Sequence, residues 1–275
     1  MSPPIENDNA GRLPPVSAQN GAGGVDSASA PASAEEAAGD AARSALRDAG
    51  SHVRFWLVVG LGLTLDLWSK HWAFSTLGQH GHRELIPNVL EFQIMLNKGA
   101  LFGIGQGLTN VFLIASVAAL FLVAWMFAHS SVRSWGLHIA LGGLVAGALG
   151  NMYDRATVRL LDDALADSRG RLFYVTVVGQ SEQGRLLVEA YPPGSGRFSA
   201  ELSAGEIPRE VGFVRDFIKI PTKLWNNRDL WPWVFNVADM LLVGGIGIVM
   251  IYLLRERRTV RQPAAGLDAS PDRSA

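Results

Sequence analysis

Residues 230–254, L-W-P-W-V-F-N-V-A-D-M-L-L-V-G-G-I-G-I-V-M-I-Y-L-L, decide the fold because they are long and apolar enough to cross a bilayer. A membrane-spanning helix needs about 20 such residues. The stretch has one acidic residue, Asp239, and Asn236 lies three positions earlier, on the same face of a helix. An ionised carboxylate in hydrocarbon costs at least about 2.5–3.5 kcal/mol, so Asp239 should face the protein interior or a wet cavity. The pair marks a candidate functional site, and the alternative is a polar clamp between two helices.

The composition favours a membrane protein over a single soluble domain. The 275 residues include no cysteine, so disulfides and thiolate chemistry are excluded, and a zinc site would need His and carboxylate ligands. The formal net charge is −1, which argues against a general nucleic-acid binder. Long, almost uncharged apolar runs alternate with polar segments, a pattern typical of polytopic membrane proteins.

Four apolar runs predict four transmembrane helices. The first three cover residues 55–74, 108–128 and 135–153, and the stretch quoted above is the fourth. The third run, L-G-G-L-V-A-G-A-L-G, is rich in small residues that let helices approach closely in lipid. Residues 1–52 are rich in Ala, Gly, Ser and Pro without a hydrophobic period. They predict a disordered tail and not a cleaved signal peptide.

Two extramembrane segments carry β-strand patterns. In residues 75–107, L-I-P-N-V-L-E-F-Q-I-M-L-N alternates apolar residues and predicts short strands at the membrane surface. The following glycines suit tight turns, and Asn97 could present its amide to a ligand. In residues 156–210, R-L-F-Y-V-T-V-V-G, R-L-L-V-E-A-Y and R-F-S-A-E-L predict two or three strands of a small β module. His80 and His82 lack a neighbouring carboxylate cluster and are typical of a loop, so we predict no metal site.

Polar residues recur near one end of the expected helices. Asp66 and Lys70 lie four residues apart on one face, late in the first helix. Asn151, Asp154 and Arg155 share a face at the end of the third helix, where Asp154 beside Arg155 could form a helix-end ion pair. Several segments thus deliver polar groups to one depth, which indicates a functional site more strongly than any single pair.

The positive-inside rule sets the orientation. Arg54, Arg133 and the arginines at 255–261 fall on one side of four helices, and that side is the cytoplasm. Both termini are then cytoplasmic. The polar groups, including Asn97 and the Asn–Asp pair of the fourth helix, collect near the outer face of the membrane.

These polar residues lie in motifs that resemble those of the bacterial lipoprotein signal peptidase, or signal peptidase II, family. The motifs are D-L-W-S-K (66–70), N-K-G-A-L-F-G (97–103), G-N-M-Y-D-R (150–155), V-R-D-F (214–217) and F-N-V-A-D (235–239). They follow the family's order and four-span layout over roughly residues 53–155 and 211–254. The resemblance implies an aspartic endopeptidase of the bacterial inner membrane. It would release the signal peptide of a prolipoprotein by cutting just before a Cys that already carries diacylglycerol.

The resemblance assigns roles residue by residue. The two catalytic aspartates map onto Asp216 and Asp239. The supporting or substrate-binding residues are Asp66, Lys70, Asn97, Asn151, Asp154, Arg155 and Asn236. The implied partners are diacylglyceryl-modified prolipoproteins and membrane lipid. We expect a monomer that needs no metal or cofactor and binds no nucleic acid.

Two features depart from the family pattern. Leu101 stands where the family usually has a smaller residue, which would narrow the pocket. The link between D-R and V-x-D-F is short in the family, whereas this chain inserts more than about fifty residues there. The insertion makes Asp162 and Asp163 rivals of Asp216, and Asp154 is a weaker rival. We favour Asp216 because its neighbours match the motif.

The sequence therefore predicts an all-α polytopic membrane protein, with four transmembrane helices, a small periplasmic β platform and an inserted periplasmic β module. The expected segments are a cytoplasmic tail (1–52), a first membrane part (53–155), the insertion (156–210), the catalytic loop with the fourth helix (211–256) and a basic cytoplasmic tail (257–275).

Two other functions fit the polar membrane residues. A small transporter or proton channel could use Asp66, Asp154 and Asp239 as a relay, and it would need polar groups through the whole membrane depth. A non-enzymatic scaffold could display the β module, and its function would survive the loss of Asp239.

Overall fold

The computed structural model describes residues 44–98, 109–203, 209–223 and 229–260. The chain divides into two compact units, Met1–Gly39 and Asp40–Ala275, and the described residues belong to the second. Most of the predicted N-terminal tail, most of the C-terminal tail and Leu101 lie outside the described residues.

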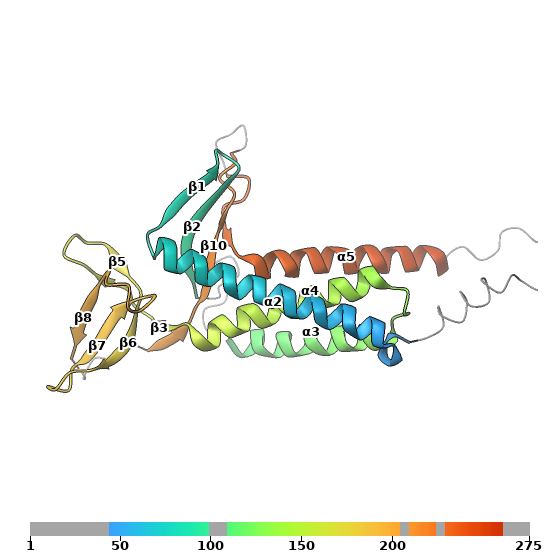
Figure 1. The fold of residues 1–275 in the computed structure, drawn as a ribbon, viewed down its shortest axis with the longest axis horizontal. Helices are drawn as coiled ribbons and strands as arrows, with labels where there is room; N and C mark the ends of the chain where they lie inside the picture. The colour runs from blue at the N-terminus through green and yellow to red at the C-terminus, as the bar shows by residue number, and fades with distance from the viewer. Residues whose placement is uncertain (1–43, 99–108, 204–208, 224–228, 261–275) are drawn as a thin grey trace, which may run out of the picture. The chain divides into compact units, whose positions relative to one another are not determined.

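The described helices are built from the apolar runs of the sequence (Figure 1). They are α2 (Ala49–Leu77), α3 (Thr109–His129), α4 (Trp135–Thr157) and α5 (Val237–Val260), and the short 3-10 helix η1 (Ala45–Arg47) precedes them. Helix α4 packs against the other three. Its small residues permit this, because a Cβ added at Gly147 would lie 2.5 Å from the carbonyl oxygen of Ala238 in α5.

Helix α5 begins seven residues after the start of the apolar stretch that predicts it. Residues Val234–Phe235 form strand β11, and the helix starts at Val237. Pro232 has no backbone N–H, and an Asn immediately before a helix is a favoured cap. Both features place the start of the helix after Asn236.

A four-stranded antiparallel sheet stands at one end of the helices. Its order is β1 (His82–Ile86), β2 (Leu90–Asn97), β10 (Val214–Lys219) and β11. Strand β10 pairs with β2 so that Val214 lies opposite Asn97. The register shifts between Asp216 and Ile218, which marks a bulge or irregularity, a feature often found beside active sites.

The insertion forms its own β module, which we define as residues 159–212. Its ends pair with each other, β3 (Arg159–Leu161) with β9 (Glu210–Gly212). Between them lie the hairpin of β4 (Leu165–Ala166) and β5 (Leu172–Phe173), and a three-stranded sheet. That sheet consists of β6 (Val175–Gln180), β7 (Leu186–Ala190) and β8 (Ser199–Leu202). A separate apolar core fills the module, with Leu161, Phe173, Val175, Val188 and Ala190 buried.

The all-α class is wrong, because strands β1 to β11 accompany the helices in antiparallel sheets. Among the described residues, only α4 and α5 are long and apolar enough to cross a membrane. The prediction of four transmembrane helices is therefore corrected to two candidate spans. Helix α2 is long enough, but it carries Arg54, Asp66 and Lys70. In α3 the part whose side chains are described, Val117–His129, is apolar but shorter than a span.

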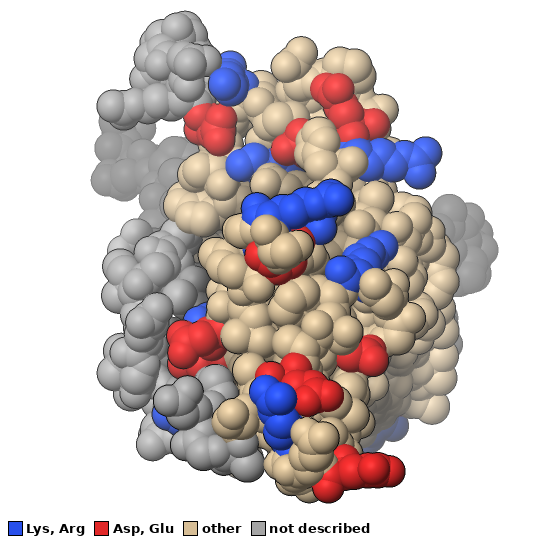
Figure 2. All heavy atoms as spheres, turned by 90° about the vertical axis from the view of Figure 1, so that its left-hand side faces the viewer, with Lys and Arg blue, Asp and Glu red and all other residues tan. Residues whose placement is uncertain are grey.

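The end of the molecule that carries the β strands has a mixed-charge surface. Figure 2 shows Lys and Arg side chains beside Asp and Glu across this face, without a patch of one sign. Individual ion pairs here, such as Arg185 with Glu201 at 3.4 Å, are exposed and contribute little to stability.

Candidate active site

Asn236 and Asp239 form a reciprocal cap at the start of α5. The side-chain oxygen of Asn236 accepts a hydrogen bond from the backbone N–H of Asp239 at 3.0 Å. In return, a carboxylate oxygen of Asp239 accepts from the backbone N–H of Asn236 at 3.2 Å. This is the geometry of a capping box, which satisfies two backbone donors that a helix start leaves unpaired. The F-N-V-A-D motif therefore fixes the Asp239 carboxylate at the open end of the helix.

Asp216 reaches the same place from strand β10. Its side chain is buried, and both carboxylate oxygens are occupied. Oδ1 accepts from the Asn236 side-chain amide at 2.6 Å, and Oδ2 accepts from the Asn97 amide at 3.0 Å. Asn236 thus contacts both aspartates, Asp216 with its side-chain nitrogen and Asp239 with its backbone.

Asn151 of α4 joins this pair to a buried lysine of α2. Its side-chain nitrogen donates to Asp239 at 2.9 Å. Its side-chain oxygen accepts from Asn236 at 3.2 Å and from Lys70 Nζ at 3.0 Å. One amide therefore connects the last helix, the catalytic candidates and the interior of the helix bundle.

Lys70 is the centre of a buried ionic cluster. Its ammonium lies 2.8 Å from an oxygen of Asp66 and 3.3 Å from an oxygen of Asp154, and all three side chains are fully buried. The other oxygen of Asp66 accepts the backbone N–H of Ala238 at 2.8 Å, in the first turn of α5. Lys70 therefore does not extend to the membrane surface, because both of its acidic partners lie inside the protein.

The expected ion pair between Asp154 and Arg155 is replaced by another. Asp154 accepts three hydrogen bonds from Arg215, one of them from its backbone N–H at 2.9 Å. The shortest side-chain contact, from Arg215 Nη2, is 2.6 Å. Neighbouring residues of a helix point in different directions, so Asp154 faces inward while Arg155 is exposed. Arg155 donates to the carbonyl oxygen of Asn151 at 3.4 Å and interacts electrostatically with Asp239 and Asp216.

The surroundings of Asp216 change its titration. Burial raises the pKa of its carboxyl, and the nearby charge of Asp239 raises it further. The hydrogen bonds from Asn97 and Asn236 stabilise the ionised form and oppose this, and the pKa is raised to about 7. A carboxyl that titrates near neutral pH is suited to exchanging protons with a substrate.

Comparison with known proteins matches this chain to one family. The model of the family "Signal peptidase (SPase) II" matches residues 58–255, which include every residue of the network described above. A lipoprotein signal peptidase from Rhodopirellula baltica is 30% identical over 72% of this chain and 71% of its own length.

The chain belongs to the signal peptidase II family. A lipoprotein signal peptidase from Clostridium novyi is 28% identical over 73% of this chain and 97% of its own length. A bacterial membrane enzyme whose structure was solved by the in meso method at 2.3 Å resolution shares the fold. Its TM-score is 0.50 at 20% identity, covering 77% of this chain and 94% of that one.

The rival residues Asp162 and Asp163 lie on the inserted module, and Asp154 is taken up by Lys70 and Arg215. Asp162 accepts two hydrogen bonds from Lys98 Nζ, at its backbone oxygen (2.6 Å) and its carboxylate (2.7 Å). Asp163 is exposed on the inserted module.

The two histidines that follow α2 have other contacts. His82 contacts Glu91 at 2.8 Å and His80 packs edge-on against Phe173. The described residues contain no group of three or more His, Cys, Asp or Glu side chains that could hold a metal ion.

Sequence reasoning missed two residues that organise the site. One is Arg215, although it stands inside the V-R-D-F motif next to Asp216. The other is Gln79, in the loop that follows α2, which makes three hydrogen bonds to the backbone of the inserted module. It donates to the carbonyl oxygens of Tyr174 and Tyr191 at 2.6 and 2.9 Å and accepts from the N–H of Tyr174 at 2.9 Å. Only the position of Arg215 gave a signal in the sequence.

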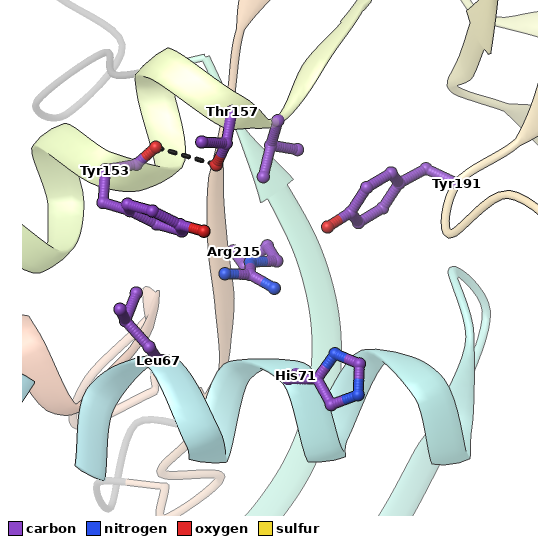
Figure 3. Close-up of a pocket in the computed structure, with 7 residues that line it drawn as sticks. Leu67, His71, Tyr153, Thr157, Tyr191 and Arg215 are labelled. Carbon is purple, nitrogen blue, oxygen red and sulfur yellow. Dashed lines mark hydrogen bonds between the residues drawn. The ribbon is translucent and has the colours of Figure 1, made fainter. Parts of the chain in front are cut away.

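A pocket of about 260 Å³ lies beside Arg215 (Figure 3). Helices α2 and α4 form two of its walls, with Leu67 and His71 from the first and Tyr153 from the second. Tyr191 of the inserted module completes it, and its hydroxyl points toward the Arg215 guanidinium in Figure 3. The insertion therefore reaches the residue next to Asp216 in the sequence.

Proposed function

We propose that this member of the signal peptidase II family, which cleaves the signal peptides of lipoproteins, does so as an aspartic endopeptidase with Asp216 and Asp239 as its catalytic pair. One observation carries the proposal. Two acidic side chains from separate elements meet on Asn236, and one of them is buried with a pKa raised to about 7. Two carboxyls held in this way share a proton, because burial and mutual repulsion disfavour two charges.

The proposed reaction uses this shared proton. Asp239 is the ionised member, which takes a proton from a water molecule while the water oxygen attacks the carbonyl carbon of the scissile bond. Asp216 keeps its proton up to about pH 7 and gives it to the carbonyl oxygen, which forms a tetrahedral intermediate. The C–N bond then breaks as Asp239 gives its proton to the leaving nitrogen, and a hydroxyl of the intermediate returns a proton to Asp216 as the carbonyl re-forms. No atom of the enzyme is bonded covalently to the substrate.

The other polar residues support the pair in this proposal. Asn97, Asn151 and Asn236 hold the carboxylates by the contacts given above, and Arg155 is exposed beside them and available to a substrate carbonyl. The buried ionic cluster of Asp66, Lys70 and Asp154 fixes the helices.

The substrate is proposed to be a prolipoprotein whose Cys carries diacylglycerol, cut just before that Cys at the outer face of the inner membrane. Trp231 and Trp233 are exposed beside the start of α5, as aromatic residues are at a membrane–water boundary. The opposite ends of the helices carry arginines and contact one another, with Arg54 donating to the carbonyl oxygen of Val132 at 3.1 Å. We place that end, and both termini, in the cytoplasm.

The acidic residues Asp66, Asp154 and Asp239 lie in one network at one end of the helices, and this disfavours a proton relay across the membrane. We expect a monomer, since one chain supplies both acids and the amides that hold them.

Lipid modification is expected to decide whether a precursor is cut. A precursor peptide with diacylglyceryl-Cys should show a kcat/KM about tenfold or more above the same peptide with unmodified Cys, because the acyl chains contribute binding energy at the bilayer. Mass spectrometry should find the new N-terminus at the Cys. Equal cleavage of the two peptides would contradict the proposed substrate.

The cleavage rate is expected to fall as pH rises above about 7. A raised pKa means that Asp216 stays protonated to higher pH than an ordinary carboxyl, and losing that proton leaves two carboxylates and no acid. Above the transition the rate should drop about tenfold for each pH unit. A profile of kcat against pH from 5 to 9 tests this, and a rate that stays constant from pH 6 to 9 would exclude Asp216 as the proton donor.

A further inference from the structure

Lys98 connects the inserted module to the residue that holds Asp216. It follows Asn97, whose amide donates to Asp216 Oδ2 at 3.0 Å. Its ammonium binds the backbone oxygen and the carboxylate of Asp162 at 2.6 and 2.7 Å. It also lies over the ring of Tyr174, at 5.5 Å from the centroid. A single side chain next to Asn97 therefore contacts two places in the insertion, the residue that follows β3 and the residue between β5 and β6.

The position of Lys98 makes this contact important for Asn97. The pairing of β2 with β10 ends at the pair Asn97–Val214, so Lys98 is the first residue beyond the ladder. The end of a strand is held less firmly than its middle. The Lys98 ammonium is 5.8 Å from the ring centroid of Phe213, which precedes β10 and is fully buried. The contact between Lys98 and Asp162, which we call the clamp, therefore stabilises the end of β2 at the point where its pairing with β10 stops.

The partner on the module is itself fixed. Asp162 follows the β3–β9 ladder, and its backbone N–H donates to the carbonyl oxygen of Arg209 at 2.9 Å. The preceding residue, Leu161, belongs to the core of the module. Gln79 ties the same module to α2 through three backbone hydrogen bonds. The module therefore has its own core and is tied to the loop after α2, and Lys98 binds it at a residue next to its β3–β9 ladder.

We propose that the inserted module is a positioning element of the active site, and that the Lys98–Asp162 clamp keeps the Asn97 amide on Asp216. This inference rests on the proposed function, because it assigns Asp216 the catalytic role. Lys98 and Asp162 act through Asn97 and touch neither water nor substrate in this proposal, so they are positioning residues. The side chains are 36% and 45% exposed, so the ion pair adds little to stability and its effect is on geometry.

The charges around Asp216 come from several elements, and the test must separate them from the clamp. Asp239 faces it from α5, Lys70 from α2 and Arg155 from α4. Asn97 lowers the pKa of Asp216 by stabilising its ionised form, against the larger raising effects of burial and Asp239. Loss of the Asn97 contact should therefore move the alkaline fall of the rate to higher pH.

Two variants weaken the clamp with opposite electrostatic effects, because Lys98→Met removes both of its hydrogen bonds and Asp162→Ala removes the one to the carboxylate. Lys98→Met removes a positive charge, which by itself raises the pKa of a neighbouring acid, and Asp162→Ala removes a negative charge, which lowers it. If the clamp acts by holding Asn97, both variants shift the alkaline limb to higher pH. Both should also lower kcat by about tenfold with KM within about twofold, since misplacing a catalytic group acts on the reaction step. Lys98→Arg, which retains the donor and the charge, should restore most of the activity.

The experiment measures kcat, KM and the pH profile with the full-length protein and a diacylglyceryl-modified precursor peptide. Arg185→Met is the matched control, because it removes an exposed ion pair of the same module far along the chain from Asn97, and its profile should equal that of the unaltered protein. Opposite shifts in the two clamp variants, or unchanged kinetics in both, would overturn the inference while Asp216-dependent cleavage stands. Absence of cleavage by the unaltered protein would instead overturn the proposed function. Complete loss in Asp162→Ala with activity retained in Asp216→Asn would overturn both.

Discussion

Asp216→Asn is expected to slow the cleavage of a lipid-modified precursor by about 10²–10⁴-fold, the usual contribution of general acid–base catalysis. Asparagine has nearly the shape of aspartate and keeps an oxygen for the amide of Asn97 or Asn236, but it cannot give up a proton to the substrate. Asp239→Asn should cause a loss of the same order, because it removes the base. Single-turnover rates with purified protein measure both effects.

The pair should behave as a unit. The double variant Asp216→Asn/Asp239→Asn is expected to be no slower than the worse single variant by more than a few-fold, because either change alone stops the shared-proton mechanism. Asp163→Asn is the matched control, since Asp163 is exposed on the inserted module and should change the rate by less than about twofold. Full activity in Asp216→Asn, or losses in the two single variants that simply multiply, would count against the pair.

The helices could be predicted well where the sequence is continuously apolar. The third run, expected over 135–153, is α4 over Trp135–Thr157, because long apolar stretches leave few alternatives to a helix. The last run is misleading at its start, since residues 230–235 are uncharged and mostly apolar, like the helix that follows. The signal was present as Asn236 and Asp239 at the spacing of a capping box, which local chemistry can reveal.

Long-range partners could not be predicted in this way. Spacing on one helix suggested the contact between Asp66 and Lys70, which lie 2.8 Å apart. It also suggested Arg155 as the partner of Asp154, and that was wrong, since Arg215 takes this place from a strand sixty-one residues away. Side-chain spacing describes one element and carries no information on which other element packs against it. The docking of the module by Gln79 is beyond sequence reasoning for the same reason.

The fold class failed for a different reason. The strand patterns in residues 75–107 and 156–210 predict the β platform and the β module, but the class all-α takes account of the helices only. In the structure the strands deliver half of the candidate pair, because Asp216 lies on β10 and its partner Asn97 on β2. A site between a sheet and a helix end places one carboxyl on each, which lets two acids approach without sharing an element.

Lys70→Met is expected to destabilise the fold by about 3–5 kcal/mol, because it leaves buried carboxylates without their cation. Arg215 still neutralises Asp154, at 2.6 Å, so the uncompensated charge is that of Asp66. The chain would then lose a fixed junction between α2 and the first turn of α5, where Asp66 accepts the N–H of Ala238. Thermal unfolding in one detergent should show a fall in Tm on the order of 10 °C.

A second substitution separates loss of charge balance from loss of packing. Asp66→Asn added to Lys70→Met removes the unpaired charge and keeps an oxygen for Ala238, so the double variant should be more stable than Lys70→Met alone. Lys219→Met is the control, because its ion pair with Asp229 spans 3.6 Å and is partly exposed, and its Tm should fall by only a few degrees. If the double variant is less stable than Lys70→Met, the lysine acts through its packing, and the cluster does not hold the end of α5 by charge.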